Sequence, residues 1–117
     1  MLSIQPRDNQ RKQRIIVVGM NVATVQRVSS YCLEWGAEVL PYYGMPQEQE
    51  IELFDPQLWV ICLPVAVNLK LPINAPILIW EEPPTVLQAS STRAELLANL
   101  EASRIEFNTM QLNCLQK

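Results

Sequence analysis

The sequence contains no histidine at all, and this absence excludes several kinds of chemistry. Catalytic groups of the Ser-His-Asp and Cys-His kinds need an imidazole as their base. Zinc sites use cysteine and histidine in close pairs, whereas Cys32, Cys62 and Cys114 are far apart in the chain. We therefore expect no zinc site, and we interpret the thiols as reduced and mostly buried.

Long apolar segments are also missing. No apolar run approaches the roughly 20 residues that a membrane-spanning helix needs, and the longest, residues 58–67, is interrupted by Pro64. The first 14 residues are polar and contain no apolar core of a secretory signal. The sequence thus predicts a cytoplasmic protein without a membrane span, and we interpret its origin as bacterial.

Charge is scarce, at 18% of residues against 49% hydrophobic. The net charge of −3 argues against nucleic acid as the main partner. Residues 7–14 contain four bases, whereas residues 34–55 contain six acids and no base. We expect residues 1–13 to form a flexible basic tail, and the apolar composition favours a protein partner or a homodimer.

The N-terminal half has the pattern of a strand, a helix and a second strand. An apolar, β-branched run at residues 15–19 predicts a strand that is buried on both faces. Apolar residues at helical spacing follow, between Asn21 as an N-cap and Gly36 as a C-terminal stop. Residues 37–43 read as a strand, which Pro41 either pushes towards an edge of the sheet or shortens.

Further elements follow along the chain. They are a short acidic helix over residues 47–54, a strand over 58–63, a loop over 64–75 and a strand over 76–80. Thr92 and Glu95 form a capping box that predicts a helix to about residue 103. Residues 105–107 read as a short fifth strand, and the order of the last ten residues is left open.

This alternation of strands and helices predicts one α/β domain over residues 14–117. We expect a single doubly wound, mostly parallel sheet of the flavodoxin or receiver kind. The loop over residues 64–75 is too short for a third helix between its strands, so we expect that helix to be missing.

Residues 55–64 (DPQLWVICLP) resemble the third strand of the receiver domains of bacterial response regulators. In that family a proline-led apolar run ends at the phosphate-accepting aspartate, and the matching position here is Cys62. Gly19 and Met20 stand where the resemblance implies the acid pair that holds magnesium, and Glu81 lies near the position of the switch hydroxyl. A thiol and a glycine cannot supply the carboxylate oxygens that magnesium prefers. The resemblance therefore implies a pseudo-receiver, which keeps the scaffold without phosphotransfer and needs no cofactor.

The resemblance also implies where a partner binds. The last helix and strands of receivers form their contact surface, which corresponds here to residues 85–110. No lysine matches the one that follows the fifth strand in receivers, and Arg104 is near that position but offset. The candidate contact residues are Trp80, Leu96, Leu97, Leu100 and Arg104. On this interpretation the chain is a regulatory or adaptor module and not an enzyme.

Two other functions stay open. The first strand and the glycine after it also resemble a dinucleotide-binding half-domain, but of the G-x-G-x-x-G motif only Gly19 is present. A small molecule or nucleotide could still bind at the strand-end rim near Gly19, Cys62 and Glu81. A reactive thiol at Cys62 is the third alternative, although no nearby cation or base is evident in the sequence.

Overall fold

The computed structural model describes residues 12–70, 75–85 and 88–115, with side chains described up to residue 104. Its centre is one sheet of four parallel strands in the order β2-β1-β3-β4. The strands are β1 (Arg14–Gly19), β2 (Glu38–Tyr42), β3 (Leu58–Cys62) and β4 (Ile77–Trp80). The predicted doubly wound α/β fold is therefore confirmed. Of the basic tail predicted over residues 1–13, only residues 12 and 13 belong to the described part of the chain.

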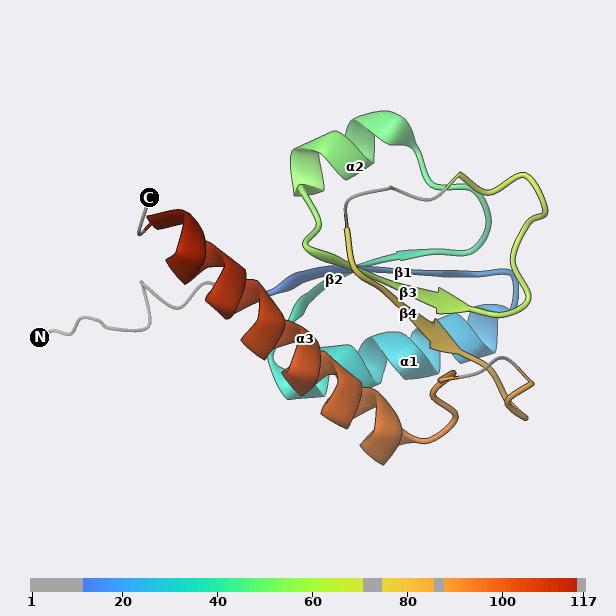
Figure 1. Cartoon of the computed structure of the whole chain (residues 1–117). Coiled ribbons are helices and arrows are strands. Elements are labelled where there is room, and N and C mark those ends of the chain that lie inside the picture. The colour runs from blue at the N-terminus through green and yellow to red at the C-terminus, as the bar shows by residue number, and fades with distance from the viewer. Residues whose placement is uncertain (1–11, 71–74, 86–87, 116–117) are drawn as a thin grey trace, which may run out of the picture.

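Helices cover both faces of the sheet (Figure 1). The helices are α1 (Val22–Trp35), α2 (Glu48–Phe54) and α3 (Arg93–Leu115). On one face, alternate residues of the strands pack with buried side chains of α1 and α3, including Val28 and Leu96. On the other face, the intervening strand residues pack with Ile51 and Phe54 of α2. The central strands β1 and β3 are buried throughout, apart from Arg14, because both of their faces are covered.

The boundaries of α1 follow from local chemistry. The side chain of Asn21 accepts a hydrogen bond from the backbone N–H of Thr24, at 3.0 Å. Gly36 ends the helix in the left-handed region, with φ of 108°, and its N–H returns to the carbonyls of the last turn. Both predicted caps are confirmed.

After residue 63, the structure agrees with one prediction from the sequence and contradicts another. The described part of residues 64–75 contains no helix, as expected from its prolines. The short strand predicted over residues 105–107 is wrong, because α3 continues without a break to Leu115. No glycine or proline interrupts the chain between Thr92 and residue 117, so nothing stops the helix once its capping box has started it.

The two edges of the sheet are different. β2 forms one edge and contains Pro41 in its interior, as predicted. β4 forms the other edge and contains neither proline nor a charged residue. No helix among the described residues is long and apolar enough to cross a membrane.

Candidate functional site: the carboxyl edge of the sheet

The parallel register brings three of the predicted positions together. Gly19 at the end of β1 is paired with Cys62 at the end of β3, and Cys62 is paired with Trp80 at the end of β4. Glu81 follows Trp80 directly in the chain. The connections from β1 and from β2 lie on opposite faces of the sheet, so β1 and β3 flank the point where doubly wound folds bind their ligands.

At this point the two strand ends touch instead of enclosing a crevice. A Cβ placed on Gly19 would lie 2.7 Å from the carbonyl oxygen of Cys62 and 3.0 Å from Cγ2 of Val25. Just beyond the strands, the backbone N–H of Met20 donates to the carbonyl of Pro64 at 3.1 Å. The space that a dinucleotide fold leaves for phosphate is thus occupied by the chain itself.

The two acids that follow β4 have partners within the chain. The Glu81 carboxylate accepts hydrogen bonds from the backbone N–H and the hydroxyl of Thr85, at 2.6 and 2.7 Å. The Glu82 carboxylate pairs with Arg27 at 2.8 Å. These acids brace the loop after β4, and in the part of the chain that the structure describes no cluster of three Cys, Asp or Glu side chains could hold a metal ion.

The thiol of Cys62 lies in the core, with 2% of the residue exposed. Burial raises its pKa to about 12, since removal from water disfavours the thiolate. Arg27 acts in the opposite direction, but its effect is smaller than that of burial. A nucleophilic or redox role needs an accessible thiolate, so the geometry disfavours the thiol alternative.

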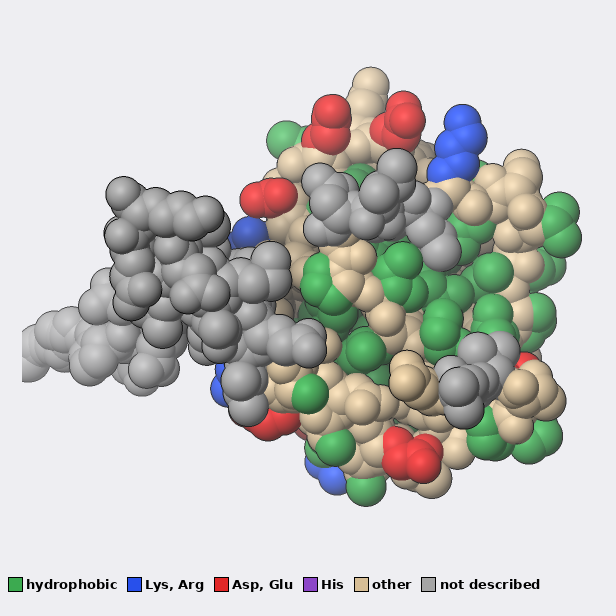
Figure 2. Space-filling view, viewed as in Figure 1, with side chains coloured by type: hydrophobic (Ala, Val, Ile, Leu, Met, Phe, Trp, Pro, Cys, Tyr) green, Lys and Arg blue, Asp and Glu red, His purple; other side chains and the backbone are tan. Residues whose placement is uncertain are grey.

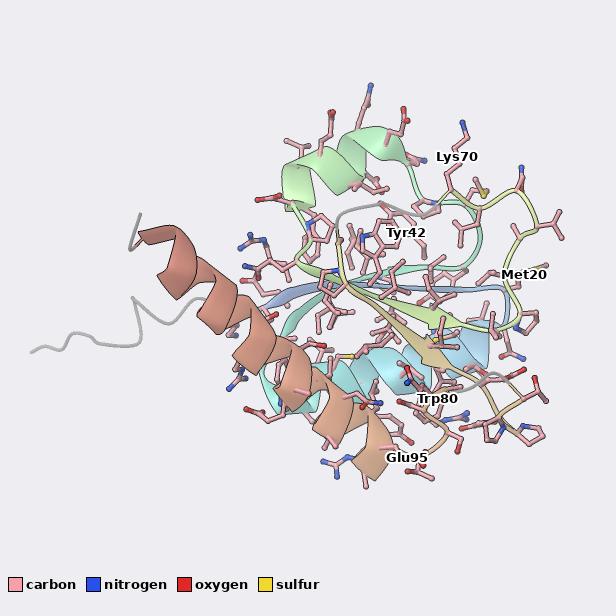
Figure 3. The ribbon with its side chains drawn as sticks, in the orientation of Figure 1. Met20, Tyr42, Lys70, Trp80 and Glu95 are labelled. Carbon is pink, nitrogen blue, oxygen red and sulfur yellow. The ribbon has the colours of Figure 1, made fainter. Side chains whose placement is uncertain are left out.

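Most of the large hydrophobic residues that are well exposed in the described chain lie at this edge. Seven large hydrophobic residues of the described chain are well exposed, and five of them follow β1, β2 or β3. We call these five the apolar rim: Met20, Val22, Tyr43, Met45 and Val67. Met20 is 56% exposed, and Val67 is as exposed as in an extended chain. Figure 3 shows Met20 beside the carboxyl ends of the strands, well away from Glu95.

Sequence reasoning marked Met20 only as a degenerate receiver position, and it did not identify Val22, Met45 or Val67 as exposed contact residues. A usable signal was present, since methionine and valine stand in strand-end loops where binding folds usually carry glycine and polar groups. In the space-filling view, hydrophobic side chains gather over β4 and the loop that follows β3 (Figure 2).

Three of the five predicted contact residues are internal. Trp80, Leu96 and Leu100 are at most 1% exposed, because they form the core between the sheet, α1 and α3. In the folded chain these three side chains cannot contact a partner, and this corrects the prediction. Leu97 is half-buried and packs against the same core.

Arg104 is also engaged within the molecule. Its guanidinium carbon lies 4.3 Å from the centre of the Trp35 ring, and its Nη1 lies 3.6 Å from Glu101. The indole N–H of Trp35 donates to the same carboxylate at 2.8 Å. We call Trp35, Glu101 and Arg104 the α1–α3 clamp, since they join the end of α1 to the middle of α3.

Comparison of the chain with protein-family models, curated proteins and solved structures finds no match. The resemblance to receiver domains therefore stays a prediction.

Proposed function

We propose that this chain is a non-catalytic, receiver-like interaction module that binds another protein through its apolar rim. The observation that carries the proposal is the chemical character of the carboxyl edge. Where doubly wound proteins place the groups that bind or react, this chain exposes Met20, Val22, Tyr43, Met45 and Val67. Exposed apolar residues gathered in one place are typical of protein-interaction surfaces.

The composition of the rim supports a protein partner. Methionine is flexible and polarisable, and it is favoured on surfaces that adapt to another protein. Tyrosine offers a large apolar ring with a polar tip, and it is enriched at interfaces. The rim residues follow β1, β2 and β3, and the central strands β1 and β3 are buried, so a partner would meet a surface with a rigid base.

The small-molecule alternative receives no comparable support. Gly19 and Cys62 are in contact, and the Asn21 side chain is already used as a helix cap. Ligand pockets combine apolar walls with a few polar groups that are free to orient the ligand. At the described strand ends, the side chains of Asn21, Glu81 and Glu82 are already bonded within the chain and are not free to orient a ligand.

The experiment compares three tagged proteins in a pull-down from native lysate, at low and moderate salt, read by mass spectrometry. They are the wild type, Val67→Asp in the rim, and Leu53→Asp as a matched control. Leu53 lies on α2 and is 88% exposed, so its replacement adds the same charge at a comparably exposed position outside the rim. Circular dichroism of each protein verifies the fold.

A partner retained by the wild type and by Leu53→Asp, but depleted about tenfold or more by Val67→Asp, supports the proposal. That factor corresponds to the cost above 1 kcal/mol that is typical of an important interface residue. The same set of proteins on all three baits contradicts it.

A further inference from the structure

The outer edge of β4 offers backbone groups to a further strand. The N–H of Leu63 donates to the carbonyl of Trp80, and the N–H of Trp59 donates to that of Pro76. Because the groups of a strand alternate in direction, those of Ile77 and Ile79 point away from β3. Figure 1 shows β4 at the open side of the sheet, in front of β3.

Among the described residues, only the carboxyl-terminal end of this edge is occupied. The N–H of Ser90 donates to the carbonyl of Ile79 at 2.7 Å, and the N–H of Glu81 donates to the carbonyl of Ser90 at 2.9 Å. Ser90 thus pairs with Trp80 as a single parallel bridge. Nearer the start of β4, the N–H and carbonyl of Ile77 and the N–H of Ile79 have no partner in the described chain. The bridge shows that extended backbone fits at this distance from β4.

Beside the free groups runs an open groove of about 560 Å³. One wall is β4, with Ile77, Leu78 and Ile79, and the other is the beginning of α3, with Glu95, Ala98 and Asn99. Leu78 packs on the α3 face of the sheet, whereas the side chains of Ile77 and Ile79 pack on the opposite face, so these two residues meet the groove with their backbone. A strand edge next to a helix, with apolar side chains between them, is a geometry that binds extended peptides.

The opposite edge of the sheet lacks this capacity. β2 carries Pro41 in its interior and Glu38 at its start, and both residue types hinder the addition of a strand. β4 has no such protection between Ile77 and Trp80. Of the two edges formed by the described strands, that of β4 is therefore the one better suited to a further strand.

We propose that the groove between β4 and α3 binds a short extended peptide of another protein, which adds to the sheet beside β4 and places a basic side chain against Glu95. The peptide pairs with Ile77 and Ile79 through its backbone and sets apolar side chains against the groove. This site is separate from the apolar rim, and it does not depend on the function proposed for the rim.

Charge decides between this occupant and a second copy of the chain. Glu95 is the only ionisable residue among the described lining of the groove. Hydrogen bonds from Ser91 and Thr92 hold the pKa of its carboxyl below the usual value, so it is negative at neutral pH. A β4 strand from a second copy carries no base to face it, whereas a peptide with lysine or arginine does.

The test begins with selection of a displayed library of random hexapeptides on the immobilised full-length protein. We expect enrichment of β-branched residues that alternate with residues of another kind, with at least one base. A selected peptide is then synthesised and its affinity measured for the wild type, for Ala98→Gln and for Ala102→Gln. Ala98 and Ala102 are both exposed on α3, but only Ala98 lines the groove.

Ala98→Gln fills the groove with a good helix former, and we expect it to weaken binding tenfold or more. Ala102→Gln should stay within twofold of the wild type. Glu95→Gln keeps a capping acceptor while it removes the charge, so it should weaken a basic peptide about twofold to fivefold. The same peptide with its base replaced by glutamine should not distinguish Glu95→Gln from the wild type.

Amide hydrogen exchange of the full-length protein adds a readout of strand pairing. On peptide binding, exchange of the Ile77 and Ile79 amides should slow strongly, while that of Leu78, which points to β3, should change little. Val67→Asp should leave all these results unchanged, so that failure at the groove and failure at the rim are distinguishable.

Four outcomes overturn the proposal. No peptide is enriched over a blank surface, or the selected peptide binds Ala98→Gln as tightly as the wild type. A third such outcome is a dimer in sedimentation that Ala98→Gln abolishes, because it would assign the edge to a second copy. The fourth is a tenfold or greater gain in peptide binding when residues 2–11 are deleted, because it would assign the groove to the basic N-terminal segment of the chain itself.

Discussion

Gly19 and Cys62 are paired at the ends of the two central strands, and their contact leaves no room for a side chain on Gly19. The nearest atom to an added Cβ is the carbonyl oxygen of Cys62, at 2.7 Å. This atom belongs to the backbone of a buried strand, so no change of rotamer can move it away. A glycine that in a nucleotide-binding fold would admit phosphate serves here to let two strand ends and α1 pack closely.

Gly19→Ala should therefore destabilise the fold by about 1–3 kcal/mol, the usual cost of an overpacked core. Urea unfolding followed by circular dichroism measures it. Because Cys62→Ala keeps both the carbonyl and the Cβ, the loss should persist in a Cys62→Ala background. A Gly19→Ala variant as stable as the wild type would show that the strand ends are free to separate.

Buried thiols should be unreactive in the native state. Burial raises the pKa of both Cys32 and Cys62 to about 12, and each residue is at most 2% exposed. In a Cys114→Ser variant, which leaves only these two, labelling at pH 7.5 should be at least about 100-fold slower than that of a free thiol. Urea-unfolded protein serves as the control. Labelling of Cys62 at the rate of the unfolded chain would revive the thiol alternative.

The same pKa shifts predict alkaline destabilisation. Above pH 9 the unfolded chain loses the protons of Cys32 and Cys62, while the folded chain keeps them until about pH 12. The unfolded state binds fewer protons in this window, so the free energy of unfolding falls as pH rises. The slope is at most about 1.4 kcal/mol per pH unit for each thiol.

Unfolding at pH 7, 9 and 10 measures this slope, and Cys32→Ala should make it shallower although it lowers stability at every pH. Tyr42 titrates in the same range, because burial and its hydrogen bond to Glu50 raise its pKa to about 12. A Tyr42→Phe variant therefore separates its contribution from that of the thiols. A stability that does not change between pH 9 and 10 contradicts the prediction.

The α1–α3 clamp should contribute measurably to stability. Arg104→Ala removes the contact with the Trp35 ring and should cost about 0.5–1 kcal/mol. Arg93→Ala is the matched control, since it breaks an exposed ion pair with Glu34 at 3.0 Å and has no contact with an aromatic ring. The stability lost in Arg93→Ala should lie at the lower end of about 0–1 kcal/mol. Equal losses in urea unfolding would show that the ring contact adds nothing.

Phosphotransfer chemistry should be absent if the receiver resemblance is correct. The position of the phosphate acceptor holds a buried thiol, Cys62, and Gly19 and Met20 offer no carboxylate for magnesium. With magnesium and acetyl phosphate, the intact mass and the thermal midpoint should stay unchanged. A receiver domain with its aspartate intact provides the positive control. A phosphorylated adduct or a magnesium-dependent midpoint would overturn the non-catalytic interpretation.

Much of the fold could be predicted because it depends on nearby residues. The run at residues 15–19 and the caps Asn21 and Gly36 determine a buried strand and a bounded helix through local backbone chemistry. Pro41 placed its strand at an edge because it lacks an N–H for a second neighbour. Residues 105–107 were misread because isoleucine and phenylalanine suit a strand as well as a helix, and only the absence of a helix stop distinguished them.

The sequence by itself thus determined the four strands, the three helices, their succession along the chain and the parallel arrangement of the sheet, but not where α3 ends. Only the tertiary structure decided which apolar residues are core and which are surface. The spacing of Leu96 and Leu100 gives α3 an apolar face, but the packing of α3 against α1 and the sheet is what buries it. The apolar rim and the open edge of β4 arise from strand order and register, which join segments far apart in the chain. Local preferences do not encode such long-range contacts, because the free energy that selects them comes from burial of the whole core.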